Sequence, residues 1–242
     1  MSSLTVAITG ASRGIGLGLA KALHERGDVV YGLCRKSNDS LNQLGLKGGV
    51  VEGVDVASDD VGSVLVEKLQ GVNIDVLVNN AGVLSREGLD GFCGNAAAAL
   101  ANARQQFEVN ALGPLKVSSA LVSNGNLKNG SKIAIVSSLM GSITDNDGGG
   151  MYAYRSSKAA VNMIGKSLAN DLKDQGIAVQ LWHPGYIATD MTASANSSGK
   201  RSVDDCIRGF LELVDKLNNA GVAETGLFFH ANYGEGRKPI PW

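Results

Sequence analysis

Short apolar segments alternate with longer, helix-like segments along almost the whole chain, and this alternation constrains the fold more than any other feature. Near-continuous apolar runs are typical of strands that are buried on both faces of a parallel sheet. Strands are predicted at residues 4–9, 29–34, 50–54, 74–78, 132–137, 177–183 and 226–230. Helices are expected near 14–26, 40–46, 59–69, 95–124, 152–174 and 204–218. The pattern predicts an α/β fold: one doubly wound parallel sheet of about seven strands, with helices on both faces.

No linker, internal repeat or run of like charge divides the chain, so residues 1–242 are predicted to form one domain of the Rossmann type. Three segments do not fit the alternation, and each follows a predicted strand: 84–94, 139–151 and 186–203. Ligands of open α/β sheets bind beyond the carboxyl ends of the strands, so these loops are expected to frame a site. A solvated connection is the alternative for each loop.

Charge and composition narrow the classes of function. The 22 basic and 23 acidic side chains give a net charge of −1, which argues against the basic face that nucleic-acid binding needs. Cys34, Cys93 and Cys206 are far apart and the three histidines are scattered, so neither a disulfide framework nor a metal site is expected. No apolar run approaches ~18 residues and no signal peptide is visible. The expected location is therefore cytoplasmic, with no membrane contact.

A glycine-rich segment stands between the first predicted strand and the first predicted helix. Gly10, Gly14 and Gly16 have the spacing G-x-x-x-G-x-G, not the commoner G-x-G-x-x-G. Glycines here allow a tight turn and let backbone N–H groups approach a pyrophosphate at the positive end of the helix. The order of strand, glycines and helix is the one that this mechanism requires, and an ordinary turn is the alternative.

Five further motifs follow the glycine loop in the order of one known family. They are Asn79-Asn80-Ala81-Gly82 after the fourth strand, Asn110 in the next long helix, Ser137-Ser138, Tyr154-x-x-x-Lys158, and Pro184-Gly185-x-x-x-Thr189. With these motifs the chain resembles the short-chain dehydrogenase/reductase family over roughly residues 4–192. The long glycine-rich stretch before Tyr154 and the terminal Pro241-Trp242 resemble its C-factor-like and sniffer-like carbonyl reductases.

This resemblance implies a set of site residues. The catalytic residues would be Asn110, Ser138, Tyr154 and Lys158. The residues that contact a nicotinamide cofactor would be Gly10, Ser12, Arg13, Gly14, Ile15, Gly16, Arg35, Asp55, Val56, Asn80, Ala81, Gly82, Tyr154, Lys158, Pro184, Gly185, Ile187 and Thr189. No metal is implied. Family members commonly pair into dimers or tetramers, so a homodimer or homotetramer is expected.

An acidic residue is missing where NAD would need one. Proteins that bind NAD usually carry Asp or Glu ~20 residues past the glycines. Here Arg35 ends the second strand, Arg13 lies in the glycine loop, and the first acid beyond the strand is Asp39. Two guanidinium groups suit a 2′-phosphate, which favours NADP; solvated loop charges are the alternative. Asp55 resembles the family's adenine-binding aspartate, with a helix N-cap or turn residue as the alternative.

Tyr154 and Lys158 lie four residues apart on one face of a predicted helix. Hydride transfer to a carbonyl leaves an alkoxide, so the protein must supply a proton. A tyrosine pKa near ~10 is unsuited to this at neutral pH, and the nearby ammonium is expected to lower that pKa. The resemblance adds that Lys158 binds the ribose hydroxyls and that Ser138 holds the substrate oxygen. A weak surface pair is the alternative for Tyr154 and Lys158, and Ser137 stays open in place of Ser138.

Pro114 lies four residues after Asn110 in the same predicted helix. Proline donates no N–H and strains the turn behind it, which frees the carbonyl of Asn110. In the family, the Asn at this place sits at a helix kink and holds a water that links the lysine to solvent. A helix that ends near residue 110 is the alternative.

The expected activity is NADPH-dependent reduction of a carbonyl (a ketone, aldehyde or quinone), with Tyr154 as proton donor. An alcohol dehydrogenase working mainly in oxidation is one alternative, and an NADP-binding sensor of the C-factor type with little turnover is another. The retained Ser138, Tyr154 and Lys158 favour an enzyme. The substrate pocket is expected to be apolar, from its candidate lining residues: Leu139, Met140, Ile143, Met151, Tyr186 and Met191.

Overall fold

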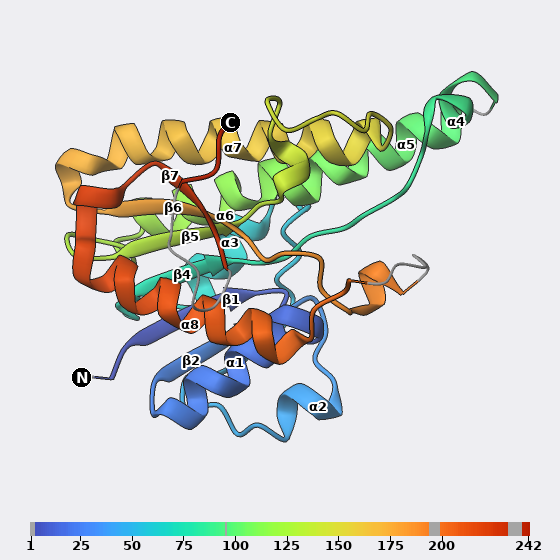
Figure 1. Ribbon diagram of the computed structural model, residues 1–242. Coiled ribbons are helices and arrows are strands. Elements are labelled where there is room, and N and C mark those ends of the chain that lie inside the picture. Colours follow the sequence, from blue (N-terminus) through green and yellow to red (C-terminus); the bar gives the residue numbers. More distant parts are fainter. Residues whose placement is uncertain (1–2, 95, 194–198, 232–238) are drawn as a thin grey trace.

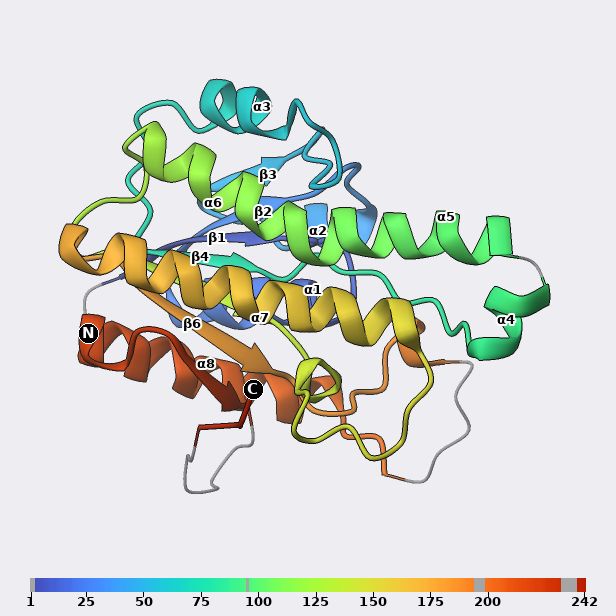
Figure 2. The same ribbon diagram turned by 90° about the horizontal axis from the view of Figure 1, so that it is seen from above.

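The computed structural model describes residues 3–94, 96–193, 199–231 and 239–242. Seven parallel strands form one sheet in the order β3-β2-β1-β4-β5-β6-β7 (Figures 1 and 2). The strands are β1 (Thr5–Thr9), β2 (Val29–Leu33), β3 (Gly49–Val51), β4 (Val76–Asn79), β5 (Lys132–Val136), β6 (Ala178–His183) and β7 (Leu227–His230). The predicted α/β fold of the Rossmann type is confirmed, and all seven predicted strands are present.

The strand order reverses between β1 and β4, which is where ligands bind to sheets of this kind. β1 pairs with β2 on one side and with β4 on the other. Farther along the sheet, Asn79 of β4 pairs with Ile135 of β5, and His183 of β6 pairs with His230 of β7. Since all strands are parallel, their last residues lie along one edge of the sheet.

Helices cover both faces of the sheet (Figures 1 and 2). On one face lie α1 (Gly14–Arg26) and α8 (Val203–Ala220), which contact each other. On the other face lie α3 (Val61–Lys68), α5 (Ala96–Phe107), α6 (Gly113–Ser123) and α7 (Tyr152–Leu172). No helix of the described ranges is long and apolar enough to cross a membrane.

Side chains of the strands alternate between two buried cores, one on each face of the sheet. Val6 and Ile8 of β1 pack into the core that includes Phe210 of α8. Ala7, which lies between them, packs into the other core, which includes Val161 of α7. Burial on both faces explains why the strands read as continuous apolar runs in the sequence.

Three segments between the strands differ in detail from the sequence predictions. The predicted helix 95–124 is built from α5, a π-helical turn at Glu108–Leu112 and α6; residue 95 lies outside the described ranges. The predicted loop 84–94 was wrong in its second half, because α4 (Leu89–Gly94) forms there and its Phe92 packs edge-on against Tyr152, with ring centres 6.1 Å apart. The predicted helix 40–46 is only the short α2 (Asp39–Asn42).

Candidate active site

The ends of β1 and β4 are tied together by the side chains of Thr9 and Asn80. The Thr9 hydroxyl oxygen accepts hydrogen bonds from the backbone N–H of Asn80 at 3.0 Å and of Ala81 at 3.1 Å. The Asn80 carboxamide donates back to the Thr9 carbonyl at 3.0 Å. The glycine loop and the Asn79–Gly82 segment therefore form one rigid unit at the point where the strand order reverses.

The glycine loop has the shape of a phosphate cradle. Gly10 and Gly14 have φ of +67° and +54°, in the left-handed region that favours glycine. A Cβ on Gly16 would lie 2.4 Å from the Gly10 carbonyl oxygen, so no larger residue fits. Asn38 donates to the Ser12 carbonyl at 2.8 Å, and a Cβ on Gly14 would come 3.6 Å from Thr189. The structure therefore brings Thr189, from the segment after β6, next to the glycine loop that contains Ser12.

Arg13 and Arg35 are both exposed and form no ion pair within the described ranges. Glu52, just after β3, has its carboxylate engaged by the Ser37 N–H at 2.6 Å, which holds its pKa below the ordinary value. Asp55 accepts a hydrogen bond from the Ala57 N–H at 3.1 Å. This bond is typical of a turn residue, which was the alternative to adenine binding.

Tyr154 and Lys158 lie on α7 one turn apart, next to the end of β5. The Lys158 Nζ stands 5.8 Å from the centre of the Tyr154 ring and donates to the Val136 carbonyl at 2.9 Å. Only 5% of Lys158 is exposed, and burial lowers the pKa of its ammonium to about 8. A buried ammonium held over the edge of the sheet is well placed to bind a polar ligand group.

Ser138, not Ser137, faces Tyr154. The Ser138 hydroxyl lies close enough to the Tyr154 phenol to lower the pKa of Tyr154, and its oxygen accepts a hydrogen bond from the Met140 N–H at 3.2 Å. The Ser137 hydroxyl instead donates to the carboxamide oxygen of Asn162, at 2.5 Å, inside the protein. Consecutive residues at the end of a strand point to opposite sides, so only one of the two serines reaches the site.

The pKa of Tyr154 is raised, whereas the sequence argument expected Lys158 to lower it. Burial is the main cause, and the Ser138 hydrogen bond and the positive charge of Arg86 work in the opposite direction. The Lys158 ammonium is directed to a backbone carbonyl and not to the phenol, which explains why the expected effect is absent. Tyr154 is therefore a protonated phenol at neutral pH.

Asn110 lies in the π-helical turn, just ahead of Pro114. The Gly113 N–H donates to the Glu108 carbonyl, five residues earlier, which is the wide hydrogen bond of a π-helical turn. A disturbed turn is what Pro114 predicts at this place. The Asn110 carboxamide accepts from the Val83 N–H at 2.9 Å and donates to the Val83 carbonyl at 2.9 Å. A Cβ on Gly82 would lie 3.4 Å from the Asn110 Oδ1 and 4.0 Å from the Lys158 Nζ. Asn110 is thus beside the lysine.

The segment after β6 carries the remaining predicted cofactor residues. Gly185, with φ of +90°, turns the chain directly after Pro184, and the buried Ile187 forms a β-bridge with Arg201. Thr189 begins a short 3-10 turn at Asp190–Thr192. Of the loop predicted at 186–203, residues 194–198 lie outside the described ranges.

The predicted apolar lining residues lie around this edge, and several are exposed. Ile143 is 80% exposed and Met191 is 41% exposed. Met151, with φ of +47°, is the one non-glycine residue in the left-handed region among those described, and it directly precedes α7. A strained residue next to a candidate site is a frequent mark of a functional constraint.

Sequence reasoning missed three residues of this region: Arg86, Gln106 and His183. Gln106 is buried and binds Ser85 twice, accepting from its N–H at 3.2 Å and donating to its hydroxyl at 2.6 Å. It precedes Asn110 by four residues, so a common helix face was the signal available for it. Arg86 and His183 have no such signal in the sequence, because only the folded structure brings them close to Tyr154 and Leu139.

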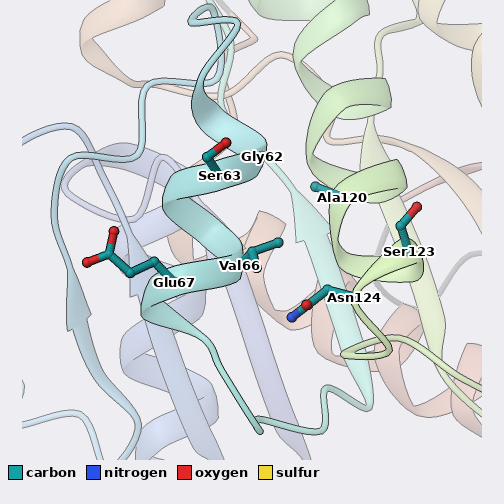
Figure 3. Close-up of a pocket in the computed structure, with 7 residues that line it drawn as sticks. All are labelled: Gly62, Ser63, Val66, Glu67, Ala120, Ser123 and Asn124. Atoms are coloured by element: carbon teal, nitrogen blue, oxygen red, sulfur yellow. The ribbon is translucent and has the colours of Figure 1, made fainter.

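A separate hollow between α3 and α6 contains none of the predicted site residues (Figure 3). Its volume is about 530 Å³, and it is lined by Gly62, Ser63, Val66, Glu67, Ala120, Ser123 and Asn124. It is an open surface feature away from the strand ends.

The sequence model of the short chain dehydrogenase family matches residues 4–200. The chain belongs to this family. A dehydrogenase of Rhodococcus sp. (strain AD45), named 1-hydroxy-2-glutathionyl-2-methyl-3-butene dehydrogenase, is 35% identical, over 94% of this chain and 96% of its own length. The C-signal of Myxococcus xanthus is 39% identical, over 70% of this chain and 93% of its own.

Solved structures of carbonyl reductases are similar over the entire chain. The NADPH-bound carbonyl reductase from chicken fatty liver has a TM-score of 0.80 at 26% identity, with both chains covered completely. The carbonyl reductase Sniffer of D. melanogaster has a TM-score of 0.79 at 27% identity, again with both chains covered completely. The chain is therefore an oxidoreductase of the C-factor-like and sniffer-like branch, with a nicotinamide dinucleotide as its cofactor.

Proposed function

We propose that this oxidoreductase reduces a carbonyl compound with NADPH, and that Tyr154 donates the proton. The proposal rests on one observation: the side chains of Ser138, Tyr154 and Lys158 lie close together at the end of β5. The similar NADPH-bound carbonyl reductase supports both the cofactor and the substrate class. Bound NADPH supplies the hydride, and the chain's own residues supply orientation and acid.

The residues at the switch point fit a dinucleotide with a 2′-phosphate. The loop suits a pyrophosphate because Gly10 and Gly14 turn it through left-handed backbone, and Gly16 lets the start of α1 pack directly against the Gly10 carbonyl. Arg13 and Arg35 offer two exposed guanidinium groups with no ion-pair partner in the described part of the chain. Lys158 is placed to bind ribose hydroxyls.

The protonation states favour reduction over oxidation. The raised pKa of Tyr154 keeps its phenol protonated at neutral pH, the form that an acid must have before it donates a proton to an alkoxide. Lys158, with a pKa of about 8, is mostly an ammonium at neutral pH, the form that can donate hydrogen bonds to ribose hydroxyls. Ser138 holds the substrate oxygen toward Tyr154.

The experiment is NADPH oxidation measured with a panel of quinones, diketones and aromatic aldehydes. We expect turnover of at least one carbonyl class, which is lost in Tyr154→Phe while NADPH affinity is kept. The ring is retained in this variant, so it serves as a matched test of the hydroxyl alone. Tight NADPH binding without turnover of any carbonyl would contradict the proposal.

Two other functions have some support from the relatives. The Rhodococcus relative is named as a dehydrogenase, which favours alcohol oxidation; NADP⁺ reduction with a panel of alcohols tests this. The C-signal favours a sensor that binds the cofactor with little turnover. A sensor would keep its biological output in Tyr154→Phe, whereas a reductase would lose it.

We also propose that the chain assembles into a homodimer or homotetramer through α5 and α7. Large apolar side chains are exposed on these helices: Leu100 at 44%, Phe107 at 37% and Met163 at 68%. Apolar area of this kind is buried at subunit interfaces. Light scattering should give a multiple of the 25.0 kDa chain mass, and a monomer at micromolar concentration would contradict the proposal.

A further inference from the structure

His183 is the last residue of β6, and it supports the catalytic serine segment from the neighbouring strand. The regular ladder between β5 and β6 ends where the Ser137 N–H donates to the Trp182 carbonyl at 2.8 Å. Two residues later the Leu139 N–H donates instead to the His183 imidazole, to Nδ1, at 3.1 Å. A side chain therefore continues the ladder where backbone pairing stops.

This bond holds the short 3-10 turn Leu139–Gly141, which begins directly after Ser138. The first N–H groups of a helical turn have no partner inside the turn. Here His183 accepts a hydrogen bond from the Leu139 N–H, and the Ser138 oxygen accepts one from the Met140 N–H at 3.2 Å. The bond from Met140 fixes the Ser138 oxygen in place, beside the Tyr154 phenol whose pKa the serine lowers.

The surroundings of His183 keep its Nδ1 an acceptor. The His230 ring lies edge-on against it, with ring centres 4.9 Å apart, and the Lys158 ammonium is also nearby. Burial and these two groups lower the pKa of His183 to about 3, so the ring is neutral at working pH. A neutral imidazole that accepts at Nδ1 carries its proton on Nε2.

We propose that His183 is a positioning residue for this reaction: its imidazole holds the Leu139 N–H and thereby fixes the Ser138 hydroxyl against Tyr154. The inference rests on the proposed carbonyl reduction. His183 does not touch the substrate but sets the geometry of Ser138, which does. Misplacement of such a group by about 1 Å can cost ~10²-fold in rate.

The test compares His183→Asn with His183→Leu. The two replacements are similar in size, but only the Asn carboxamide oxygen can accept from the Leu139 N–H in place of Nδ1. We expect His183→Leu to lose roughly tenfold or more in kcat with NADPH affinity unchanged, and His183→Asn to recover most of the loss. In His183→Leu the limb of the pH profile that Tyr154 sets should move to higher pH, because a displaced Ser138 no longer lowers the pKa of Tyr154.

Equal losses in both variants, or a wild-type rate in His183→Leu, would overturn the inference. A second readout does not depend on turnover: ¹⁵N NMR of the wild-type chain should show His183 neutral, with an unprotonated, hydrogen-bonded Nδ1, from pH 5 to pH 8 (about the range in which a free imidazole titrates). A proton on Nδ1 would also overturn it. Full activity of Tyr154→Phe would instead overturn the proposed proton donor and leave the NMR result standing.

Discussion

The nucleotide side of the site and its substrate side are held in different ways. On the nucleotide side, the glycine loop and the Asn79–Gly82 segment are joined by short polar contacts between neighbouring strand ends, chiefly through Thr9 and Asn80. On the substrate side, residues 139–151 form a long loop. Its N-terminal turn is held by His183, and the Thr144 N–H donates to the Trp242 carbonyl at 3.1 Å.

The difference follows from what each side must bind. A dinucleotide presents the same pyrophosphate and ribose groups in every protein that binds it, so a cradle of glycines and strand ends suits it and can be recognised in the sequence. The substrate side ends in exposed apolar residues such as Ile143 and Met191, on connections that can change without disturbing the sheet. Variants that damage one side and spare the other test this division.

The largest effect is expected for Tyr154→Phe. The variant removes the proposed proton donor and keeps the buried ring, so kcat should fall by ~10²-fold or more while NADPH affinity stays near the wild-type value. Steady-state kinetics and a fluorescence titration with NADPH measure the two quantities.

Lys158→Met is the companion variant, because Lys158 stands between the two sides. It should reduce both kcat and NADPH affinity, since the ammonium is assigned to the ribose and lies 5.8 Å from the centre of the Tyr154 ring. If Lys158→Met changed kcat alone, the lysine would belong to the substrate side only.

Gly141→Ala should be the next most damaging change, and it acts at the contact between the serine turn and α7. A Cβ at this position would lie 2.7 Å from the Lys158 carbonyl carbon, and backbone cannot yield as a flexible side chain does. We expect kcat to fall by about tenfold and stability by about 1–3 kcal/mol, measured by urea unfolding. Gly88→Ala, with nothing within 4 Å of its added Cβ, is the control and should behave like wild type.

Much of the nucleotide side could be predicted because its residues lie close together in the sequence. The glycine loop spans one strand-to-helix turn, and Tyr154 and Lys158 are four residues apart on one helix. Hydrophobic continuity identified the strands, since each is buried on both faces. Strand alternation explains why only Ser138 of the serine pair reaches Tyr154.

The remaining features depend on contacts between distant segments. His183 and Leu139 are 44 residues apart, and no local pattern connects an imidazole to that backbone N–H. α4 was missed because its six residues include two glycines, and its Phe92 is packed by Tyr152 from the start of α7. The sign of the Tyr154 pKa shift depends on burial, which the spacing to Lys158 does not reveal.

Arg35→Asp should have a smaller effect, confined to the nucleotide side. It places a carboxylate where a 2′-phosphate is expected, so NADPH affinity should fall several-fold and the preference over NADH should shrink. The kcat measured at saturating cofactor should change little. Isothermal titration of both cofactors against wild type and variant checks this; equal affinities in the wild type would contradict the assignment of NADP.

Arg86→Gln should have the smallest effect, and it tests how an exposed residue of the β4–α4 connection acts on Tyr154, the proposed acid. The positive charge of Arg86 lowers the pKa of Tyr154, so its removal raises that pKa further. Reduction requires the protonated phenol and declines as pH rises through this pKa, so the limb of kcat that Tyr154 sets, above the titration of Lys158 at about 8, should move to higher pH. Arg104→Gln, on the exposed surface of α5, removes the same charge without acting on Tyr154 and is the matched control. A shift to lower pH in Arg86→Gln, or the same shift in both variants, would show that the limb reports a group other than Tyr154.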